Sequence, residues 1–468
     1  MYGDVNVTVV DGIKRQQNRN GKGVQFKIGI GKESDTPILI TGAMKNAEIK
    51  ELLGKTPLAD ACMDSIEWGA KTIYCIPVAA SVAGEVGTVE VETSGDGIIE
   101  IEGIPNNAYE ILVQIVEGGA NNEGTFIYST NGGNSYTEEA TIPVTGMVEI
   151  PHTGLTLKFE DTAGAFDADD TFAFVTTAPA MSNAAILDAV YKIANTNIAF
   201  EFAHIVGTSA RALWAMLGAV AEDFIETYKK PCFFVCEGRG IATDEDIYDY
   251  VEAILEERKG ITSSYVQVVL SNSLYVRDGR EQKINNAGIV AGMYCNAKES
   301  QSIGEPKSFP VPPNKMISLL PAGIEEYIEQ LDTARYLTFR QYAGRDEYFV
   351  TSARMLAASD SAYPYAEDIR VSNRLVKAVR EKLLEELQIE IDPADQEATL
   401  ARIAAEANIP VEDAIADNII SSGEATIDSD NIDLMTSEEI EVTVTYVAMR
   451  HLRSIQLTFS VENPNTVD

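Results

Sequence analysis

The chain has 468 residues, of which 45% are hydrophobic and 23% charged, so it is long enough for two to four domains with ordinary buried cores. Its formal net charge is −36 and its isoelectric point is about 4.4, which argues against binding to duplex nucleic acid or to anionic membranes. The longest uninterrupted apolar run, 212–221, is too short for a membrane-spanning helix, and no signal peptide is visible at the start. We therefore expect a soluble protein without membrane insertion.

The negative charge is concentrated in two segments. Residues 87–180 carry sixteen acidic side chains against the single Lys158, and residues 385–468 carry nineteen against three arginines. The first segment is also rich in Gly, Asn and Thr and forms short alternating runs, whereas its flanks alternate strands with amphipathic helices. This change in composition and in hydrophobic pattern predicts an all-β domain inserted into an α/β protein.

Residues 1–86 predict an N-terminal strand arm and the first part of an α/β core. The arm is Val5–Val10, a β-rich run that precedes a polar stretch. Further predicted elements follow in the order strand 25–31, strand 36–41, helix 46–53, helix 59–68 and strand 71–77.

Residues 87–180 predict about eight short strands separated by turn signals. In one of them Leu155, Leu157 and Phe159 alternate with polar residues, as one buried face of a strand requires. Asn131-Gly132 favours a tight hairpin. Short strands at this spacing are typical of a small sandwich.

Residues 181–350 return to the α/β rhythm. Strands are predicted over 199–206, 231–236, 265–270, 336–342 and 347–351, and helices over 184–194, 209–228, 285–297 and 324–331. A further helix is expected after Thr243, as its N-cap with Asp246 three residues on. This alternation predicts a mixed, largely parallel sheet covered on both faces.

Residues 351–468 predict a C-terminal domain with a long helix, 369–387, and a strand-rich end. Four cations share one arc of this helix: Arg370, Arg374, Lys377 and Arg380. A short helix is expected over 395–407, an acidic turn at 428–433 and strands over 439–447 and 454–461. The first and last strands of the chain both lie outside the α/β rhythm.

Two motifs that suggest chemistry have the wrong spacing. Gly29-Ile30-Gly31-Lys32 lacks the earlier glycine and the following hydroxyl of a phosphate loop, so we interpret it as a turn at the end of a strand. Cys232 and Cys236 are four residues apart in an apolar run, which favours two core thiols over a metal or redox site. An odd number of cysteines in apolar surroundings is typical of a reducing compartment.

Three further features also favour a structural interpretation. His204 lies within an apolar run and is expected to be a core histidine with its hydrogen bonds satisfied. Asp428, Asp430 and Glu439 match only part of a calcium loop. Residues 129–136 resemble the Asp-box hairpin of sialidases, which is a folding device and implies no activity. We therefore expect no catalytic, cofactor-binding or metal-binding site and no enzyme.

The segment Arg335–Leu387 has a distinctive order of elements. A strand pair ending at Gly344–Val350 leads through Ala353-Arg354 into Asp368–Leu375, which opens a long helix. This stretch resembles the tail sheath proteins of contractile phages and of phage-derived injection particles, which show a similar strand, an arginine and a Val-x-x-Arg entry into a helix. Pro321-Ala322-Gly323 is the nearest match to the Pro-Ala-Gly turn of that family.

The resemblance covers about residues 1–86 and 181–468. Variable domains inserted at the outer surface are typical of the family, so the resemblance implies that the inserted domain, 87–180, is an outer domain. The resemblance also implies a structural subunit that polymerises into stacked rings around an inner tail tube and contracts to drive the tube through a cell envelope. Implied partners are further copies of the chain, the tube protein, and baseplate and tail terminator proteins, without direct nucleic-acid contact. The implied location is a virion tail assembled in the host cytoplasm.

The ends of the chain are the expected interlocking strands, because a terminal strand can pair with the sheet edge of a neighbour. Their candidate residues are Val5, Val7, Val9, Ile455, Leu457 and Phe459. The basic arc of the 369–387 helix is the expected tube-facing surface. The alternatives are an acidic α/β hydrolase or transferase with a carbohydrate-binding β insert, and a tube or baseplate component.

Overall fold

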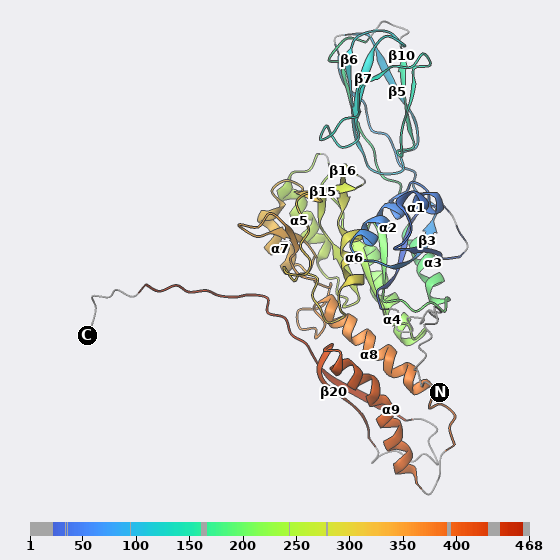
Figure 1. Cartoon of the computed structure of the whole chain (residues 1–468), viewed down its shortest axis with the longest axis vertical. Coiled ribbons are helices and arrows are strands. Elements are labelled where there is room, and N and C mark those ends of the chain that lie inside the picture. The colour runs from blue at the N-terminus through green and yellow to red at the C-terminus, as the bar shows by residue number, and fades with distance from the viewer. Residues whose placement is uncertain are drawn as a thin grey trace, which may run out of the picture. The chain divides into compact units, whose positions relative to one another are not determined.

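The computed structural model describes residues 22–32, 34, 36–93, 95–160, 166–242, 244–277, 279–390, 395–428 and 440–461. The chain divides into two compact units, Met1–Ala378 and Val379–Asp468. The expected fold class is confirmed: an α/β core with a mixed sheet, an inserted all-β sandwich and a C-terminal region with further strands (Figure 1).

A six-stranded sheet with the order β14-β13-β12-β1-β3-β2 forms the centre of the first unit. Its strands are parallel except β2, which pairs antiparallel with β3 at one edge. The strands are β1 (Val24–Ile30), β2 (Ile38–Thr41), β3 (Thr72–Val78), β12 (Phe202–Thr208), β13 (Phe233–Glu237) and β14 (Val266–Val269). All of β1 except its last residue is buried, as a parallel strand covered on both faces should be.

Helices cover both faces of this sheet. α2 and α6 pack on each other and on β1 and β12, while α3 contacts β1, β3 and α4, and α4 contacts β13 and β14 (Figure 1). The helices are α1 (Asn46–Leu53), α2 (Pro57–Glu67), α3 (Asn183–Ala194), α4 (Arg211–Glu226), α5 (Ile247–Arg258) and α6 (Ala287–Asn296). This arrangement is that of a doubly wound α/β protein.

The strand order reverses between β1 and β12, the point at which doubly wound proteins often bind ligands. Here packing closes that point. A Cβ atom on Gly29 would lie 2.9 Å from the Cβ of Val206 and 3.2 Å from Leu58, so glycine is needed for close approach of the neighbouring elements. The Gly-Ile-Gly-Lys stretch therefore serves packing, and no phosphate loop is formed there.

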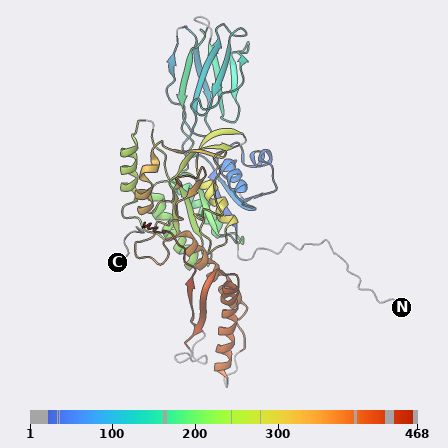
Figure 2. The same cartoon turned by 60° about the vertical axis from the view of Figure 1, so that its left-hand side comes forward.

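The inserted domain has its own two sheets and its own hydrophobic core (Figure 2). One sheet has the order β5-β10-β9 and the other β4-β11-β6-β7-β8. Leu155, Leu157 and Phe159 of β10 point into the core and alternate with half-buried residues, as predicted. The strands are β4 (Glu90–Glu92), β5 (Ile98–Gly103), β6 (Glu110–Glu117), β7 (Thr125–Ser129), β8 (Ala140–Thr141), β9 (Met147–Ile150), β10 (Leu155–Glu160) and β11 (Thr171–Val175).

The turn after β7 has the internal hydrogen bonds of a self-contained folding device. The Ser129 hydroxyl accepts hydrogen bonds from the backbone N–H groups of Asn131 and Gly133, and Asn131 Oδ1 accepts one from Ser135. The Asn131 amide also donates to the Glu281 carbonyl oxygen at 2.9 Å. An aspartate has no proton to donate there, so the asparagine lets this turn bind a neighbouring segment.

The rest of the first unit contains a hairpin that was missing from the sequence prediction. β15 pairs with β16 and with β17, and Arg277 at the end of β15 binds Asp64 of α2 through two nitrogens at 2.8 and 2.6 Å. The elements are β15 (Asn272–Arg277), β16 (Arg280–Asn285), β17 (Met316–Leu320), η1 (Ile324–Tyr327), α7 (Ile328–Thr333), β18 (Phe339–Gln341), β19 (Tyr348–Val350) and α8 (Ala366–Leu384).

The second unit is built on α9 (Gln396–Ala416), β20 (Ile420–Ile427) and β21 (Val442–Ala448). α9 packs its apolar side chains on β20. A Cβ atom on Gly423 of β20 would lie 3.0 Å from Val411 of α9, which shows how closely the two elements approach. Among the described residues, no helix is long and apolar enough to cross a bilayer.

Three local predictions differ from the structure. α5 begins at Ile247 with Asp246 as its N-cap, whose carboxylate accepts a hydrogen bond from Asp249 N, whereas the predicted cap Thr243 lies outside the described residues. α9 continues through Pro410 to Ala416, whereas the predicted helix ended at residue 407. Residues 454–461 form no strand within the chain.

Separate cores predict separate unfolding. Phe159→Ala should lower the free energy of unfolding of the inserted domain by about 3–5 kcal/mol. The Phe159 ring is 2% exposed and packs on Phe126 and Phe166. Hydrogen exchange should then accelerate in β5–β10 while β12 and β13 stay protected. Thr156→Ala, on the other face of β10, is the control; equal acceleration in both cores would contradict independent folding.

Candidate assembly interface

The two edges of the β20–β21 sheet differ, because a side chain of α9 binds the backbone at one position of the β20 edge. At the outer edge of β20, Asn408 of α9 binds both backbone groups of Ala425: its amide donates to the carbonyl at 2.7 Å and its oxygen accepts from the N–H at 2.9 Å. Ala425 lies opposite Val444, so in an antiparallel ladder Val444 also directs its backbone groups away from its partner strand. Within the described part of the chain, nothing pairs with that edge of β21.

A two-stranded sheet is marginally stable by itself, and an open edge is a template for another strand. β21 has half-buried residues at alternate positions, among them Val442, Val444 and Tyr446. These side chains have apolar surface that remains partly in contact with water. An added strand on β21 would satisfy the backbone groups of the edge and could cover this row.

The segment that follows β21 supplies apolar side chains of the right spacing. Ile455, Leu457, Phe459 and Val461 are 77%, 74%, 86% and 97% exposed. In extended chain, side chains at every second position lie on one face, so these four would form one continuous apolar stripe. Each would contribute about 1.5–3 kcal/mol if fully buried. A stripe of this kind on an isolated chain indicates a missing partner.

The other predicted interlocking strand, with Val5, Val7 and Val9, lies outside the described residues. Its role stays a prediction. The structure thus describes the proposed acceptor edge and one of the two proposed donor segments.

The four cations of the basic helix arc have different surroundings in the structure. Arg370 is buried: its Nε lies 2.5 Å from Glu201 Oε1, and its Nη2 donates to the Tyr294 carbonyl oxygen at 2.8 Å. Arg374 binds Glu299 at 3.4 Å. These contacts hold the first half of α8 on the α/β core.

The next two cations of the arc differ from each other. Lys377 donates from Nζ to the Phe200 carbonyl oxygen at 2.5 Å, and burial lowers the pKa of this lysine. Arg380, by contrast, is exposed. A tube contact by this helix stays a prediction, and Arg380 is the cation of the arc whose side chain is exposed enough to make it.

His204 is a core residue with both ring nitrogens occupied. Lys27 Nζ donates to Nδ1 at 2.6 Å, so Nε2 carries the proton and donates to Glu237 Oε1 at 3.0 Å. Burial and the nearby Lys27 hold the pKa of His204 well below its usual range, and burial raises the pKa of Glu237 to about 7. The imidazole has no nitrogen left to activate a hydroxyl or thiol.

The remaining candidates for chemistry are also structural. Cys232 and Cys236 are fully buried, and burial raises the pKa of Cys232 to about 12, so its reactive thiolate is disfavoured. Over the described ranges, no group of three or more His, Cys, Asp or Glu side chains is arranged to hold a metal ion. Asp430 and Glu439 of the partial calcium loop lie outside those ranges.

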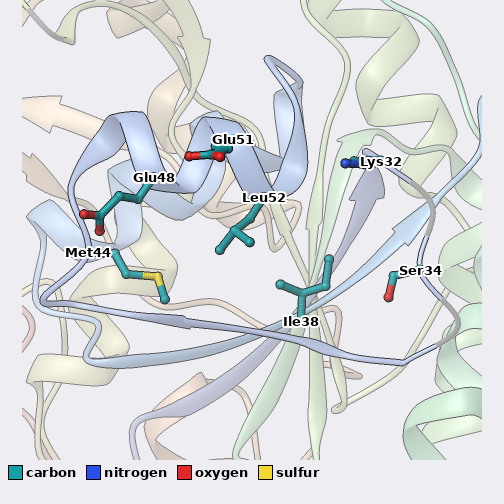
Figure 3. A pocket seen from close by; sticks show the side chains of 7 residues that line it. All are labelled: Lys32, Ser34, Ile38, Met44, Glu48, Glu51 and Leu52. Atoms are coloured by element: carbon teal, nitrogen blue, oxygen red, sulfur yellow. The ribbon is translucent and has the colours of Figure 1, made fainter.

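A groove of about 580 Å³ runs beside β2 and α1 (Figure 3). Ile38, Met44 and Leu52 provide apolar surface, and Glu48, Glu51 and Lys32 provide charge. The described residues that line this open groove form no arrangement of nucleophile and base.

Family models cover nearly the whole chain. The DUF2586 N-terminal domain matches residues 2–354, and the DUF2586 C-terminal domain matches residues 362–466. The chain belongs to the DUF2586 family. No curated protein matches its sequence.

The DUF2586 chain is similar in fold to several solved sheath structures. The crystal structure of a sheath tail protein from Desulfitobacterium hafniense has a TM-score of 0.52 at 14% identity, over 94% of this chain and 100% of that one. The contracted helical sheath of the anti-feeding prophage has a TM-score of 0.53 at 10% identity, over 97% of this chain and 99% of that one. The contracted PVC sheath complex of an extracellular contractile injection system has a TM-score of 0.55 at 11% identity, over 98% of this chain and 97% of that one. The DUF2586 chain therefore has the sheath fold over almost its full length.

Sequence reasoning missed two functional features of the DUF2586 chain. β20 was not predicted, although Ile420, Ala425 and Ile427 alternate in part with polar residues. The role of Arg370 was also missed, because its partner Glu201 is far away in sequence and nothing local indicates the pairing.

The buried ion pair predicts that two arginines of α8 respond differently to substitution. Arg370→Ala should destabilise the protein by about 3–5 kcal/mol, because Glu201 would remain buried without its cation. Arg380→Ala should change stability by no more than about 0.5 kcal/mol. Denaturant unfolding of both variants checks this; equal effects would contradict the assignment of Arg370 as a buried anchor.

Proposed function

We propose that this DUF2586 chain is the structural subunit of a contractile sheath. It polymerises into stacked rings around an inner tube and contracts to drive the tube through a cell envelope. The observation that carries the proposal is the combination of an open β21 edge with an exposed apolar stripe at residues 455–461. The sheath fold at TM-scores of 0.52–0.55 supports it.

While residues 455–461 stay extended and unpaired, their apolar side chains remain in water and do not stabilise their own subunit. If this segment adds to β21 of a neighbouring subunit, backbone hydrogen bonds give affinity and the alternate side chains give register. A subunit that donates one strand and accepts another forms a head-to-tail contact, which generates rings or helical polymers. Strand connections of this kind keep subunits joined while the packed cores between them rearrange during contraction.

The hydrolase or transferase alternative has less support. Both ring nitrogens of His204 are bonded to Lys27 and Glu237, and Leu58 and Val206 close the strand switch point. The described residues that line the groove beside β2 form no catalytic arrangement. We propose a non-enzymatic role. Function in a virion tail or injection particle, with assembly in the host cytoplasm, is part of the same proposal.

Further partners follow from this role. The contracted sheath and baseplate assemblies of the anti-feeding prophage contain chains of similar fold, which supports self-assembly and a baseplate contact. An inner tube protein and a tail terminator are further proposed partners. For the tube, the exposed Arg380 would contribute an individually weak charge contact of about 0–1 kcal/mol that repeats around each ring.

The proposed strand exchange is tested by placing charge on each face of the extended segment 455–461. Leu457→Asp with Phe459→Asp should abolish tube formation seen by electron microscopy, because two carboxylates would enter the apolar contact. Gln456→Asp with Thr458→Asp adds the same charge to the opposite face and should leave tubes intact. Normal tubes from the first pair, with a folded subunit by circular dichroism, would rule out this strand exchange.

The inserted domain is proposed to face outward, since its segment carries net negative charge that would repel itself inside a closed tube. Replacing residues 87–178 by a short Gly/Ser linker should leave a polymer with the same inner diameter and a smaller outer diameter. Cryo-electron microscopy of both polymers measures this. A change of inner diameter would place the domain inside instead.

A further inference from the structure

The central sheet of the first unit also ends in an exposed edge. β2 pairs with β3 through Ile38–Thr41, and its other side has no strand partner in the described chain. Ile40 is fully buried, while Leu39 is 37% exposed on the opposite face. β2 therefore has a packed inner side and a backbone edge that is available for a further strand.

The groove described above lies along this edge (Figure 3). Ile38 of β2 and Leu52 of α1 face it, with Met44 at one end and Lys32 and Ser34 at the other. Glu48 and Glu51 line the α1 side. A strand added to β2 would place alternate side chains against Ile38, Leu52 and Met44.

The chain before Lys22 begins close to this groove. Thr41 and Val24 both pair with Thr72 of β3, so the last residue of β2 is two strand spacings, ~10 Å, from the start of β1. Residues 11–21 reach up to ~35 Å when extended, more than the ~14 Å from β1 to a strand beyond β2. A strand over residues 5–10 with Val10 near Thr41 would run parallel to β2.

The residue chemistry of this segment matches the groove in that direction. Val5, Val7 and Val9 alternate with Asn6 and Thr8, which gives one apolar face for the apolar surface of the groove. Asp4 would come to the end that carries Lys32. Lys14 and Arg15, which follow the strand, would come to the end near Glu48.

We infer that, in the unassembled subunit, residues 4–10 of the same chain dock on β2 as a seventh strand of the central sheet. This rests on the proposed function, in which the same valines later interlock with a neighbouring subunit. The docked segment is then unavailable to neighbours, so assembly requires its release from β2 and its exchange onto another subunit. The intramolecular site thereby limits premature polymerisation.

Hydrogen exchange of the full-length monomer tests this docking. The parent protein carries Leu457→Asp and Phe459→Asp and is confirmed as a monomer by sedimentation, so the result does not depend on whether tubes form. The groove variant adds Glu51→Lys and Leu52→Glu to the parent, which changes the groove lining. Glu48 is left unchanged because its carboxylate accepts a hydrogen bond from Lys45 N and caps α1. The control is Glu222→Lys with Ala219→Glu on α4, which makes the same net charge change away from the groove at two exposed positions.

We expect residues 5–10 and 38–41 to exchange about tenfold more slowly in the parent and the control than in the groove variant. Three results would each overturn the inference. Rapid exchange of residues 5–10 in the parent would show that the segment is undocked. Protection that survives the groove variant would place it elsewhere. Protection that increases with protein concentration would assign the groove to a second copy.

Discussion

Unpaired strand edges are the constraint on which the rest of this structure depends. Backbone N–H and C=O groups along a strand need partners, and natural proteins cover, charge or pair the edges that they expose. In the second unit, Asn408 covers the outer edge of β20 at Ala425, while no strand of the described residues pairs with the edge of β21. The β20 edge is thus blocked at this position, which favours the β21 edge as the place where an added strand binds.

The α/β core provides a rigid base for such exchange. Its ion pairs join segments that are far apart in sequence: Arg370 with Glu201, and Arg277 with Asp64. Buried pairs of this kind add little net stability compared with apolar packing, but each partner is costly to lose, so they favour one arrangement of the elements. The hydrogen bonds that link Lys27, His204 and Glu237 also favour one arrangement of the elements. In them a neutral imidazole connects a cation to a carboxyl group inside the core.

Much of the fold could be predicted from the sequence because its signals are local. The period-two pattern of Leu155, Leu157 and Phe159 defined a strand, and the change in charge density marked the insert. The apolar alternation at Ile455, Leu457 and Phe459 was equally visible, but sequence cannot tell whether its partner is in the same chain. In the structure these side chains are exposed, and their pairing with a neighbouring subunit stays a prediction.

The helix arc shows where local reasoning fails. A helical wheel places Arg370, Arg374, Lys377 and Arg380 together. In the structure the first three bind Glu201, Glu299 and the Phe200 carbonyl group, whereas Arg380 is exposed. Periodicity defines a face of a helix and not what covers it. The β15–β16 hairpin was missed for a related reason: its second strand is polar and is held by pairing with β15 and not by an apolar face of its own.

The central claim is that residues 455–461 of one subunit add to β21 of another. The most direct measurement mixes isotopically labelled chains that carry a photo-crosslinker at position 457 with unlabelled chains, followed by assembly, irradiation and mass spectrometry. The account predicts crosslinks from the labelled tail to residues 442–448 of the unlabelled chain. Crosslinks confined to the labelled chain, or directed to β20 or the inserted domain, would contradict it.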